Sequence, residues 1–334
     1  SRPTIRDVAR EAGVSIATVS RVLNAKGDVS EAARERVQDA AAALGYSADP
    51  VARALVSQKT HLVGVVVGDN AGHRDLSLIF FGKVLAAIAR RLSESGYEPL
   101  LLHDTATDHR FDVAILIGVD EDDPLVQELA ARDLPLVGVD VRCRGARTAF
   151  VGSDHAGGVR LTLAHLYALG HRRIAHIAGA ANTLAGAERL GAFRREAAGL
   201  GLEVPEDYVR RGDFSSASGH REAVALLELE RPPTAIVAGS DLMALAVLQA
   251  IWESGRRPGK DVAVVGFDDI EAAALSHPPL TTIRQSRDEL GTVAAAFAVA
   301  LLESPDGAGR TATLPVELVV RGSTAGAPTR SAAR

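Results

Sequence analysis

The chain has 334 residues, of which 47% are hydrophobic and 24% charged, a composition typical of a globular protein with room for one small domain and a two-lobed core. No run approaches the roughly 20 apolar residues of a membrane span, and the single cysteine, Cys143, excludes a disulfide framework and a cysteine-rich zinc site. The net charge of −5 argues by itself against nucleic acid, but residues 1–60 carry nine Lys and Arg against seven Asp and Glu, or +2, which leaves −7 for the rest. A weakly positive head on an acidic body suggests DNA contact confined to one end.

Residues 4–24 predict two short helices joined by a tight turn. Thr4 followed by Asp7 is a capping-box start, and Gly13 lets the chain reverse without a Cβ clash. Ser15 can cap a second helix, whose solvent-facing side chains are small, hydrogen-bonding or cationic. Such a helix fits the major groove of DNA, where bulk is excluded and base edges are read. The spacing favours a DNA-binding helix-turn-helix over a generic helical hairpin.

A third helix and a linker follow. Ser30 begins a run over 31–44 with one apolar face, and Gly45 ends it. Three helices of this length form a small domain that buries little surface and is marginal alone. Asp49 and Pro50 then open another helical turn, with Asp as the cap and Pro in the first position.

These segments resemble the lactose-repressor and purine-repressor family of bacterial transcription regulators. The resemblance is specific and extends over nearly the whole chain. It implies an all-α helix-turn-helix domain at 1–46, a hinge at 47–60, and beyond it an α/β core. The residues that carry it here are Asp7-Val8-Ala9, Ala12-Gly13-Val14-Ser15, Ala17-Thr18-Val19-Ser20-Arg21-Val22-Leu23-Asn24, Val29-Ser30, Leu44-Gly45-Tyr46 and Ala52-Arg53-Ala54-Leu55.

The resemblance also implies how double-stranded operator DNA is bound. The hinges of a homodimer enter the minor groove of a near-palindromic site, and a Leu wedges between base pairs to kink the DNA. Leu55 stands at that position, where the alternative is an ordinary buried linker leucine, and Ala52 is small enough for close approach of paired hinges. The expected DNA-binding residues are Thr4, Ser15, Ile16, Ala17, Thr18, Ser20, Arg21, Asn24, Ala52 and Leu55.

Beyond residue 60, apolar strand candidates alternate with helical stretches. This alternation predicts parallel sheets with helices on both faces. Roughly 260 residues exceed one compact sheet, so we expect two doubly wound lobes with a cleft between them. Strands are expected at 62–67, 100–102, 113–117, 135–139, 174–178, 235–238 and 262–266, and helices at 78–92, 124–132, 158–169, 188–198, 216–227, 241–253 and 287–302.

The resemblance implies a periplasmic-binding-protein-like fold over 61–320, with the chain crossing between lobes near Gly170, Ile283 and Pro315. The first lobe then spans about 61–169 and 285–314, and the second about 170–284 and 315–320. Residues 321–334 lack apolar heptads, so a flexible tail is expected instead of the coiled segment that makes tetramers in some relatives.

One connection does not fit the pattern. Residues 103–112, ten in all, separate two strand candidates, whereas a parallel crossover with its helix needs a dozen or more. Family members place a full helix here, so either this protein lacks that helix or the sequence omits residues.

Effector recognition is expected near the strand ends. A sugar needs a carboxylate that accepts from hydroxyls, a guanidinium that donates to them, and an aromatic face. Family motifs place these at Asp268, Arg189 and Phe214, where the alternatives are a helix cap, a surface ion pair and core filling. Gln285, near a lobe crossover, is a further candidate. Ser240 replaces the Asn of many sugar-binding members, which implies a larger or differently bonded ligand.

Other function classes fit less well. Catalytic motifs are missing, and the resemblance gives no cofactor or metal, so an enzyme is not expected. We interpret His165 as a buried structural histidine. The family has a loop near the cleft at the position of the Asp154-His155 pair. A periplasmic sugar-binding protein would carry an export signal and lack the DNA-reading head. No signal peptide precedes the first helix, so the cytoplasm is the expected location.

A purine-responsive regulator with corepressor logic remains the main alternative to a sugar-responsive repressor. A purine usually stacks between aromatics on both faces, and Phe80 and Phe81 can supply the second face. The segment 69–75, near the first strand, departs from the family pattern and leaves the first-lobe half of the pocket and the ligand undefined.

Overall fold

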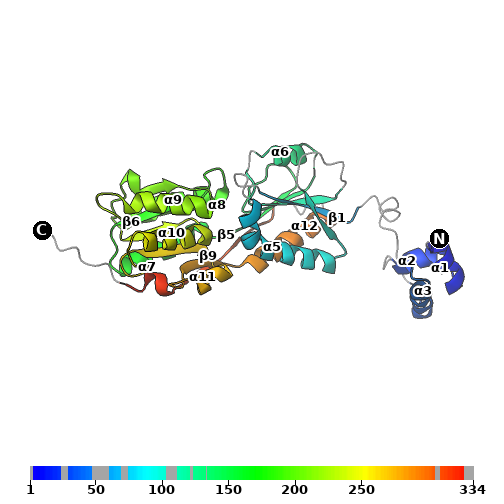
Figure 1. Cartoon of the computed structure of the whole chain (residues 1–334). Helices are drawn as coiled ribbons and strands as arrows, with labels where there is room; N and C mark the ends of the chain where they lie inside the picture. Colours follow the sequence, from blue (N-terminus) through cyan, green and yellow to red (C-terminus); the bar gives the residue numbers. More distant parts are fainter. Residues whose placement is uncertain are drawn as a thin grey trace. The chain divides into compact units, whose positions relative to one another are not determined.

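The computed structural model describes residues 3–23, 29–46, 60–68, 74–102, 111–120, 123–132, 134–304 and 309–326, without the side chains of residues 74–79 and 125. The chain divides into two compact units, Ser1–His61 and Leu62–Arg334, which are described one at a time (Figure 1). The predicted hinge residues Ala52 and Leu55 and the DNA-binding candidate Asn24 lie outside the described residues.

The first unit is a head of three helices around a small apolar core. The helices are α1 (Ile5–Ala12), α2 (Ile16–Leu23) and α3 (Glu31–Leu44). Each contributes one fully buried valine, Val8, Val19 and Val37. Gly13 and Gly45 end α1 and α3 in the left-handed conformation, with φ of 61° and 59°, which confirms both predicted stops.

The starts of the head helices follow the predicted caps in two cases. The Thr4 amide donates to the Asp7 carboxylate at 2.9 Å, as in a capping box. Ser15 Oγ accepts from the Thr18 amide at 3.1 Å and so caps α2. Ser30 precedes α3 but makes no side-chain cap hydrogen bond.

The first lobe of the core is a parallel sheet in the order β11-β5-β4-β3-β1-β2. Helices α5 and α12 pack on one face and α6 on the other, so the apolar strands are buried from both sides. The elements are β1 (Leu62–Val67), α5 (Arg74–Glu94), β2 (Glu98–Leu102), β3 (Val113–Ile117), α6 (Pro124–Ala131), β4 (Leu136–Val139), β5 (Thr148–Ser153), α12 (Arg287–Glu303) and β11 (Thr311–Leu314).

The second lobe has the sheet order β12-β10-β9-β8-β6-β7, parallel except for β12 against β10. Helices α7 and α8 cover one face, and α9 and α10 the other. The elements are α7 (His155–Ala168), β6 (Ile174–Ala178), α8 (Leu184–Gly199), η1 (Glu206–Tyr208), β7 (Val209–Arg211), α9 (Ser216–Leu227), β8 (Ala235–Ala238), α10 (Asp241–Glu253), β9 (Ala263–Asp268), α11 (Glu271–Leu275), β10 (Thr281–Gln285), β12 (Val316–Val319) and η3 (Gly322–Thr324).

The first crossing between lobes corrects the sequence prediction. It was expected near Gly170, but the chain leaves the first sheet at Ser153 and α7 already belongs to the second lobe. Val159, Leu163 and Leu166 of α7 pack in one buried cluster with residues of α8, β6 and β8. The apolar side of α7 therefore assigns this helix to the second lobe. The later crossings lie at Ser286 and Pro315.

The short connection between β2 and β3 falls largely outside the described residues. Both strands pair in parallel with β1, and residues 103–110 lie outside the described part of the chain.

Among the residues that are described, no helix is both long enough and apolar enough to cross a membrane.

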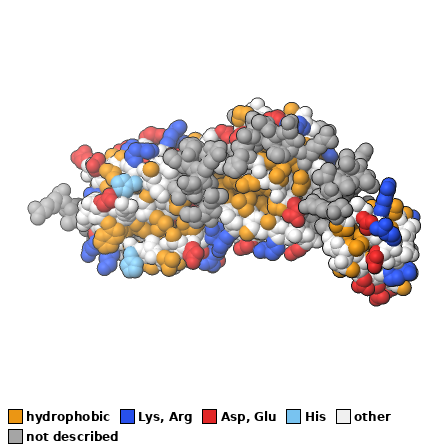
Figure 2. Space-filling view, turned by 45° about the vertical axis from the view of Figure 1, so that its right-hand side comes forward, with side chains coloured by type: hydrophobic (Ala, Val, Ile, Leu, Met, Phe, Trp, Pro, Cys, Tyr) orange, Lys and Arg blue, Asp and Glu red, His pale blue; other side chains and the backbone are white. Residues whose placement is uncertain are grey.

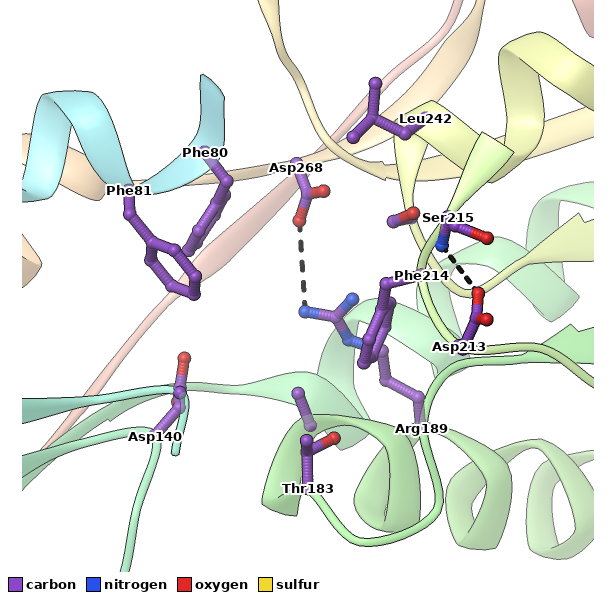
Figure 3. A pocket seen from close by; sticks show the side chains of 13 residues that line it. Phe80, Phe81, Asp140, Thr183, Arg189, Asp213, Phe214, Ser215, Leu242 and Asp268 are labelled. Carbon is purple, nitrogen blue, oxygen red and sulfur yellow. Dashed lines mark hydrogen bonds and ion pairs between the residues drawn. The ribbon is translucent and has the colours of Figure 1, made fainter. Parts of the chain in front are cut away.

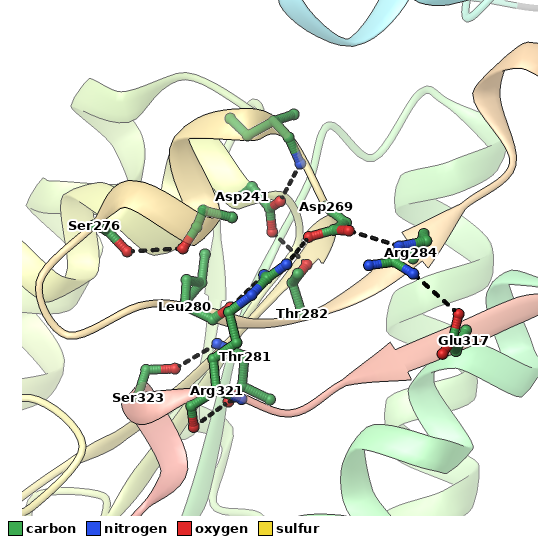
Figure 4. Close-up of polar contacts among 12 residues, drawn as sticks. Asp241, Asp269, Ser276, Leu280, Thr281, Thr282, Arg284, Glu317, Arg321 and Ser323 are labelled. Atoms are coloured by element: carbon green, nitrogen blue, oxygen red, sulfur yellow. Dashed lines mark hydrogen bonds and ion pairs between the residues drawn. The ribbon is translucent and has the colours of Figure 1, made fainter.

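The segment 321–326 also differs from the expected tail, because it is bound to the second sheet (Figure 4). Ser323 is fully buried, accepts from the Thr281 amide at 2.8 Å and donates to the Val264 carbonyl at 2.6 Å. Arg321 forms an ion pair with Asp269 at 2.6 Å. These contacts satisfy backbone groups of β9 and β10, which composition alone does not reveal.

We expect a chain ending after Val320 to lose about 3 kcal/mol of stability, since it loses several buried hydrogen bonds worth about 1 kcal/mol each. For a core of this size the loss lowers Tm by roughly 5–10 °C. A chain ending after Gly326 keeps these contacts and should melt as the full chain does. Equal Tm values for the two truncated chains in calorimetry would contradict the anchoring role of 321–326.

Candidate functional site

A cavity opens between the two lobes, with side chains of both in its wall (Figure 3). The space between its walls measures about 800 Å³ when the solvent at its open side is included. Much of its wall comes from the carboxyl ends of strands, where doubly wound folds bind ligands. The lining residues are Phe80, Phe81, Gly118, Asp140, Thr183, Ala185, Arg189, Asp213, Phe214, Ser215, Ser240, Leu242 and Asp268.

The structure gathers four of the five residues that the sequence analysis assigned to the effector, Arg189, Phe214, Ser240 and Asp268. Gln285 is not in the lining; its side-chain amide donates to Asp268 Oδ1 at 2.7 Å. Ser240 also serves as N-cap of α10, since its Oγ accepts from the Met243 amide at 3.3 Å.

Arg189 is the buried cation of the site. Helix α8 presents it, and Thr183 fixes the start of that helix by accepting from the Gly186 amide at 3.1 Å. The Arg189 guanidinium lies 3.7 Å from the centroid of the Phe267 ring and donates to the Gly239 carbonyl at 2.5 Å. Burial lowers its pKa, which the nearby carboxylates oppose. Stacking on one side and hydrogen bonding on another orient the guanidinium toward the cavity.

Asp268 is the acceptor that faces Arg189, with 3.9 Å between Oδ1 and Nη2. Burial raises the pKa of Asp268 to about 6, although Arg189 lowers it. Asp241, fully buried at the start of α10, has its pKa raised to about 7 by burial and by the charge of Asp268. Its oxygens accept from Thr282 Oγ1 at 2.5 Å and the Ile270 amide at 2.9 Å (Figure 4).

Aromatic rings stand on two sides of the cavity. Phe214 comes from the second lobe, and Phe80 and Phe81 come from α5 of the first lobe (Figure 3). The two α5 rings meet edge to face at 5.1 Å between centroids. The tip of the Phe214 ring packs against Gly179, which has no Cβ; a Cβ there would come within 2.0 Å of the ring. A flat ligand or a sugar ring has an apolar surface on either side.

Backbone strain is concentrated at this site. Among the described residues, the non-glycine positions with positive φ are His61, Asp140, Phe214, Asp268 and Asp269. Three of them line the cavity, and Asp269 follows the third directly. Each such residue costs about 1–3 kcal/mol and persists where surrounding contacts hold it. For Asp269, the contacts are ion pairs with Arg284 at 2.7 Å and Arg321 at 2.6 Å.

Sequence reasoning missed Asp140, Thr183, Asp213 and Ser215 as lining residues. Asp140 directly follows β4, so the general position of ligands at strand ends in doubly wound folds could have identified it. Asp213 and Ser215 flank Phe214, and the Ser215 amide donates to Asp213 Oδ1 at 2.9 Å.

The buried carboxyls predict a pH dependence of stability. Because the folded-state pKa values of Asp241 and Asp268 exceed the ordinary 3.8, their contribution to the free energy of unfolding is full at low pH and is lost as pH rises through about 4 to 7. His171 and His176, whose pKa values burial lowers to about 4, act in the opposite direction. The Asp241→Asn variant removes one carboxyl and keeps the histidines.

The stability of Asp241→Asn relative to the parent protein should therefore increase from pH 5 to pH 7.5, in urea unfolding without effector. A difference that does not change with pH would show that Asp241 is not proton-linked.

The head presents a separate candidate surface on α2. Ile16 is 46% exposed, and Ala17 and Arg21 are exposed beside it, while Thr18 and Ser20 are half-buried. Thr4 and Ser15 are exposed but also cap helices, so part of their polarity is used locally. Acidic and basic side chains intermingle on the head (Figure 2).

Comparisons with known proteins match both parts of the chain. The model "Bacterial regulatory proteins, lacI family" matches residues 4–49, and "Periplasmic binding protein-like domain" matches residues 163–324. The HTH-type transcriptional regulator CelR of Thermobifida fusca is 36% identical over 303 residues, which cover 87% of this chain and 89% of that protein. The chain belongs to the LacI family.

Other members of the LacI family agree in sequence and structure. The lactose operon repressor of Escherichia coli is 33% identical and covers 98% of this chain and 92% of its own length. A lac repressor dimer bound to operator and the anti-inducer ONPF has a TM-score of 0.81 at 31% identity, with 97% and 99% of the chains covered. A CelR–cellobiose complex has a TM-score of 0.73 at 33% identity, with 96% and 100% covered.

This LacI-family chain is thus a DNA-binding transcription regulator and not an enzyme. Among the described residues, no group of three or more His, Cys, Asp and Glu side chains is placed to hold a metal ion. The predicted helix-turn-helix head and the two-lobed α/β core are both confirmed.

Proposed function

We propose that this protein is a cytoplasmic repressor of carbohydrate-utilisation genes that leaves its operator when a sugar binds between the lobes. The observation that carries this proposal is the placement of a buried donor, Arg189, against a buried acceptor, Asp268, between aromatic rings of both lobes. A hydroxyl both donates and accepts, so it can use both groups at once. A sugar ring also offers an apolar face to Phe214.

The relatives support a carbohydrate. The solved CelR structure is a complex with cellobiose, and two curated relatives are named for the lactose and ribose operons. The short Ser240 side chain in the cavity wall leaves more room for a ligand than the Asn of many sugar-binding members would.

A purine remains the second candidate. Phe80 and Phe81 stand across the cavity from Phe214, which suits a base stacked on both faces. A PurR repressor of Aliivibrio fischeri is 31% identical and covers 96% of this chain. A purine corepressor would strengthen operator binding, whereas a sugar inducer would weaken it.

At the DNA we propose a homodimer on a near-palindromic operator. The α2 residues Ile16, Ala17 and Arg21 read bases in the major groove, and the hinge residues Ala52 and Leu55 enter the minor groove. A change in the angle between the lobes alters the spacing of the two hinges. Effector and operator binding are then reciprocally coupled, typically by about 1–3 kcal/mol.

The test is an operator titration with a palindromic duplex selected from random DNA by the protein itself. Cellobiose, lactose, ribose and hypoxanthine are each added at millimolar concentration, with a thermal-shift measurement in parallel. A ligand at 100 times its Kd raises stability by about 2.7 kcal/mol. A sugar that both stabilises the protein and weakens operator binding supports the proposal. Tighter operator binding with hypoxanthine would replace it with the corepressor mechanism.

A further inference from the structure

We propose that His155 is a positioning residue, which joins Asp140 of the first lobe to Arg189 of the second and holds the Arg189 guanidinium in its effector-binding orientation. The inference rests on the proposed function, because it assigns Arg189 to effector binding. It adds a residue outside the cavity lining, at the start of α7, directly after the first crossing between the lobes.

The three side chains form one hydrogen-bonded row. His155 Nε2 lies 3.1 Å from Asp140 Oδ1, and Arg189 Nε donates to His155 Nδ1 at 3.3 Å. The His155 side chain is completely buried, and those of Asp140 and Arg189 are 11% and 5% exposed. Asp140 follows β4 of the first lobe, whereas His155 begins α7 and Arg189 lies in α8 of the second. The row therefore spans the boundary between the lobes.

The direction of each hydrogen bond follows from the chemistry of the groups. A guanidinium only donates, so His155 Nδ1 must accept and carries no proton. The proton of the neutral ring is then on Nε2, where it is donated to the Asp140 carboxylate. Asp140 suits this role, because its Oδ1 also accepts from the Ser153 amide at 3.1 Å and is thereby held as an acceptor. Both ring nitrogens of His155 are used.

The hydrogen bond from Arg189 to His155 links the orientation of the guanidinium to the first lobe. Its Nη1 is bonded to the Gly239 carbonyl and its plane is stacked on Phe267, both in the second lobe. The bond to His155 is the link in this row that connects its orientation to the first lobe. Asp140 also lines the cavity, so a ligand that contacts Asp140 and Arg189 meets two groups already joined through His155. A movement of the first lobe would therefore change the orientation of the Arg189 guanidinium.

The first measurement needs no effector. Nitrogen-15 NMR of the histidine rings, with the His155 signals assigned by their loss in His155→Gln, should show the neutral Nε2–H form at pH 7. The Arg189 Nε–H proton should exchange slowly in the parent protein and in His155→Gln, whose amide can both accept and donate. It should exchange rapidly in His155→Leu. An Nδ1–H or doubly protonated ring, or an unchanged Arg189 signal in His155→Leu, overturns the proposal.

The second measurement uses cellobiose as probe in calorimetric titration. His155→Leu should weaken binding at least about tenfold, the effect of losing a hydrogen bond to a charged group, and His155→Gln should largely restore it. His165→Gln is the matched control, since His165 lies on the same helix and contacts Thr324 at 3.0 Å. Equal losses in both His155 variants mean a packing role and overturn the proposal. If the parent protein binds no cellobiose, that probe fails for the proposed function, and the NMR result still decides the role of His155.

Discussion

The Asp268→Asn variant should lose its response to effector while binding operator with parental affinity in the absence of effector. Asp268 is 8% exposed, faces Arg189 across 3.9 Å and is held by Gln285. Removing one partner of a buried charged interaction costs about 2–5 kcal/mol, a factor of about 30 to several thousand in affinity. Calorimetric titration with the identified sugar measures the affinity for effector. Operator titration with and without the sugar measures the affinity for DNA and its response to effector.

Asp261→Asn is the matched control, because Asp261 makes the same kind of ion pair, with Arg257 at 2.8 Å, at the surface of the second lobe. It should behave as the parent protein does. A parental response in Asp268→Asn would show that the pocket is placed wrongly. Loss of operator binding without effector would show that Asp268 is needed for the structure and not for the ligand.

The sequence predicted those parts of the fold that local patterns determine. Helix α10 and strand β1 begin and end at the predicted residues, since each is a sharply bounded apolar segment. Strands β5 and β10 were not foreseen, because their short polar–apolar mixtures lack a period and are stabilised by neighbouring strands.

Helix α7 begins earlier than the sequence predicts. The predicted start was Gly158, but the helix begins at His155, with Asp154 accepting from the Gly157 amide at 2.8 Å. A Cβ at Gly158 would lie 2.7 Å from the Phe267 ring, so this glycine allows close packing. The requirement belongs to a contact between distant segments and leaves no local signal.

The site divides in the same way. Arg189, Phe214, Ser240 and Asp268 lie in motifs of the second lobe, and the structure brings them to one cavity. The role of His155 depends on two bonds to partners 15 and 34 residues away, which no spacing rule relates. Motifs thus identify the groups that face the ligand better than the groups that hold them.

The second large effect is expected in the head, where Arg21→Ala should weaken operator binding by about 1–3 kcal/mol per half-site if the guanidinium bonds a guanine. Arg21 is exposed on α2, next to Ile16 and Ala17, so it can reach a base edge. In a dimer, both half-sites lose this binding free energy. Fluorescence titration at fixed salt on the selected palindrome, and on variants with the contacted base pair changed, measures affinity and specificity together.

A phosphate contact makes a different prediction for Arg21. Losing it weakens binding to all sequences alike and lowers the slope of affinity against salt by about one. Arg36→Ala is the control, since it removes the same charge from the same head but from α3, where Arg36 is exposed and bonds the Ala32 carbonyl at 3.3 Å. If Arg21→Ala relaxes the preference at one base pair and Arg36→Ala does not, Arg21 reads that base. Equal losses on specific and random duplexes would assign Arg21 to the phosphate backbone and leave base reading to Ile16 and Ala17.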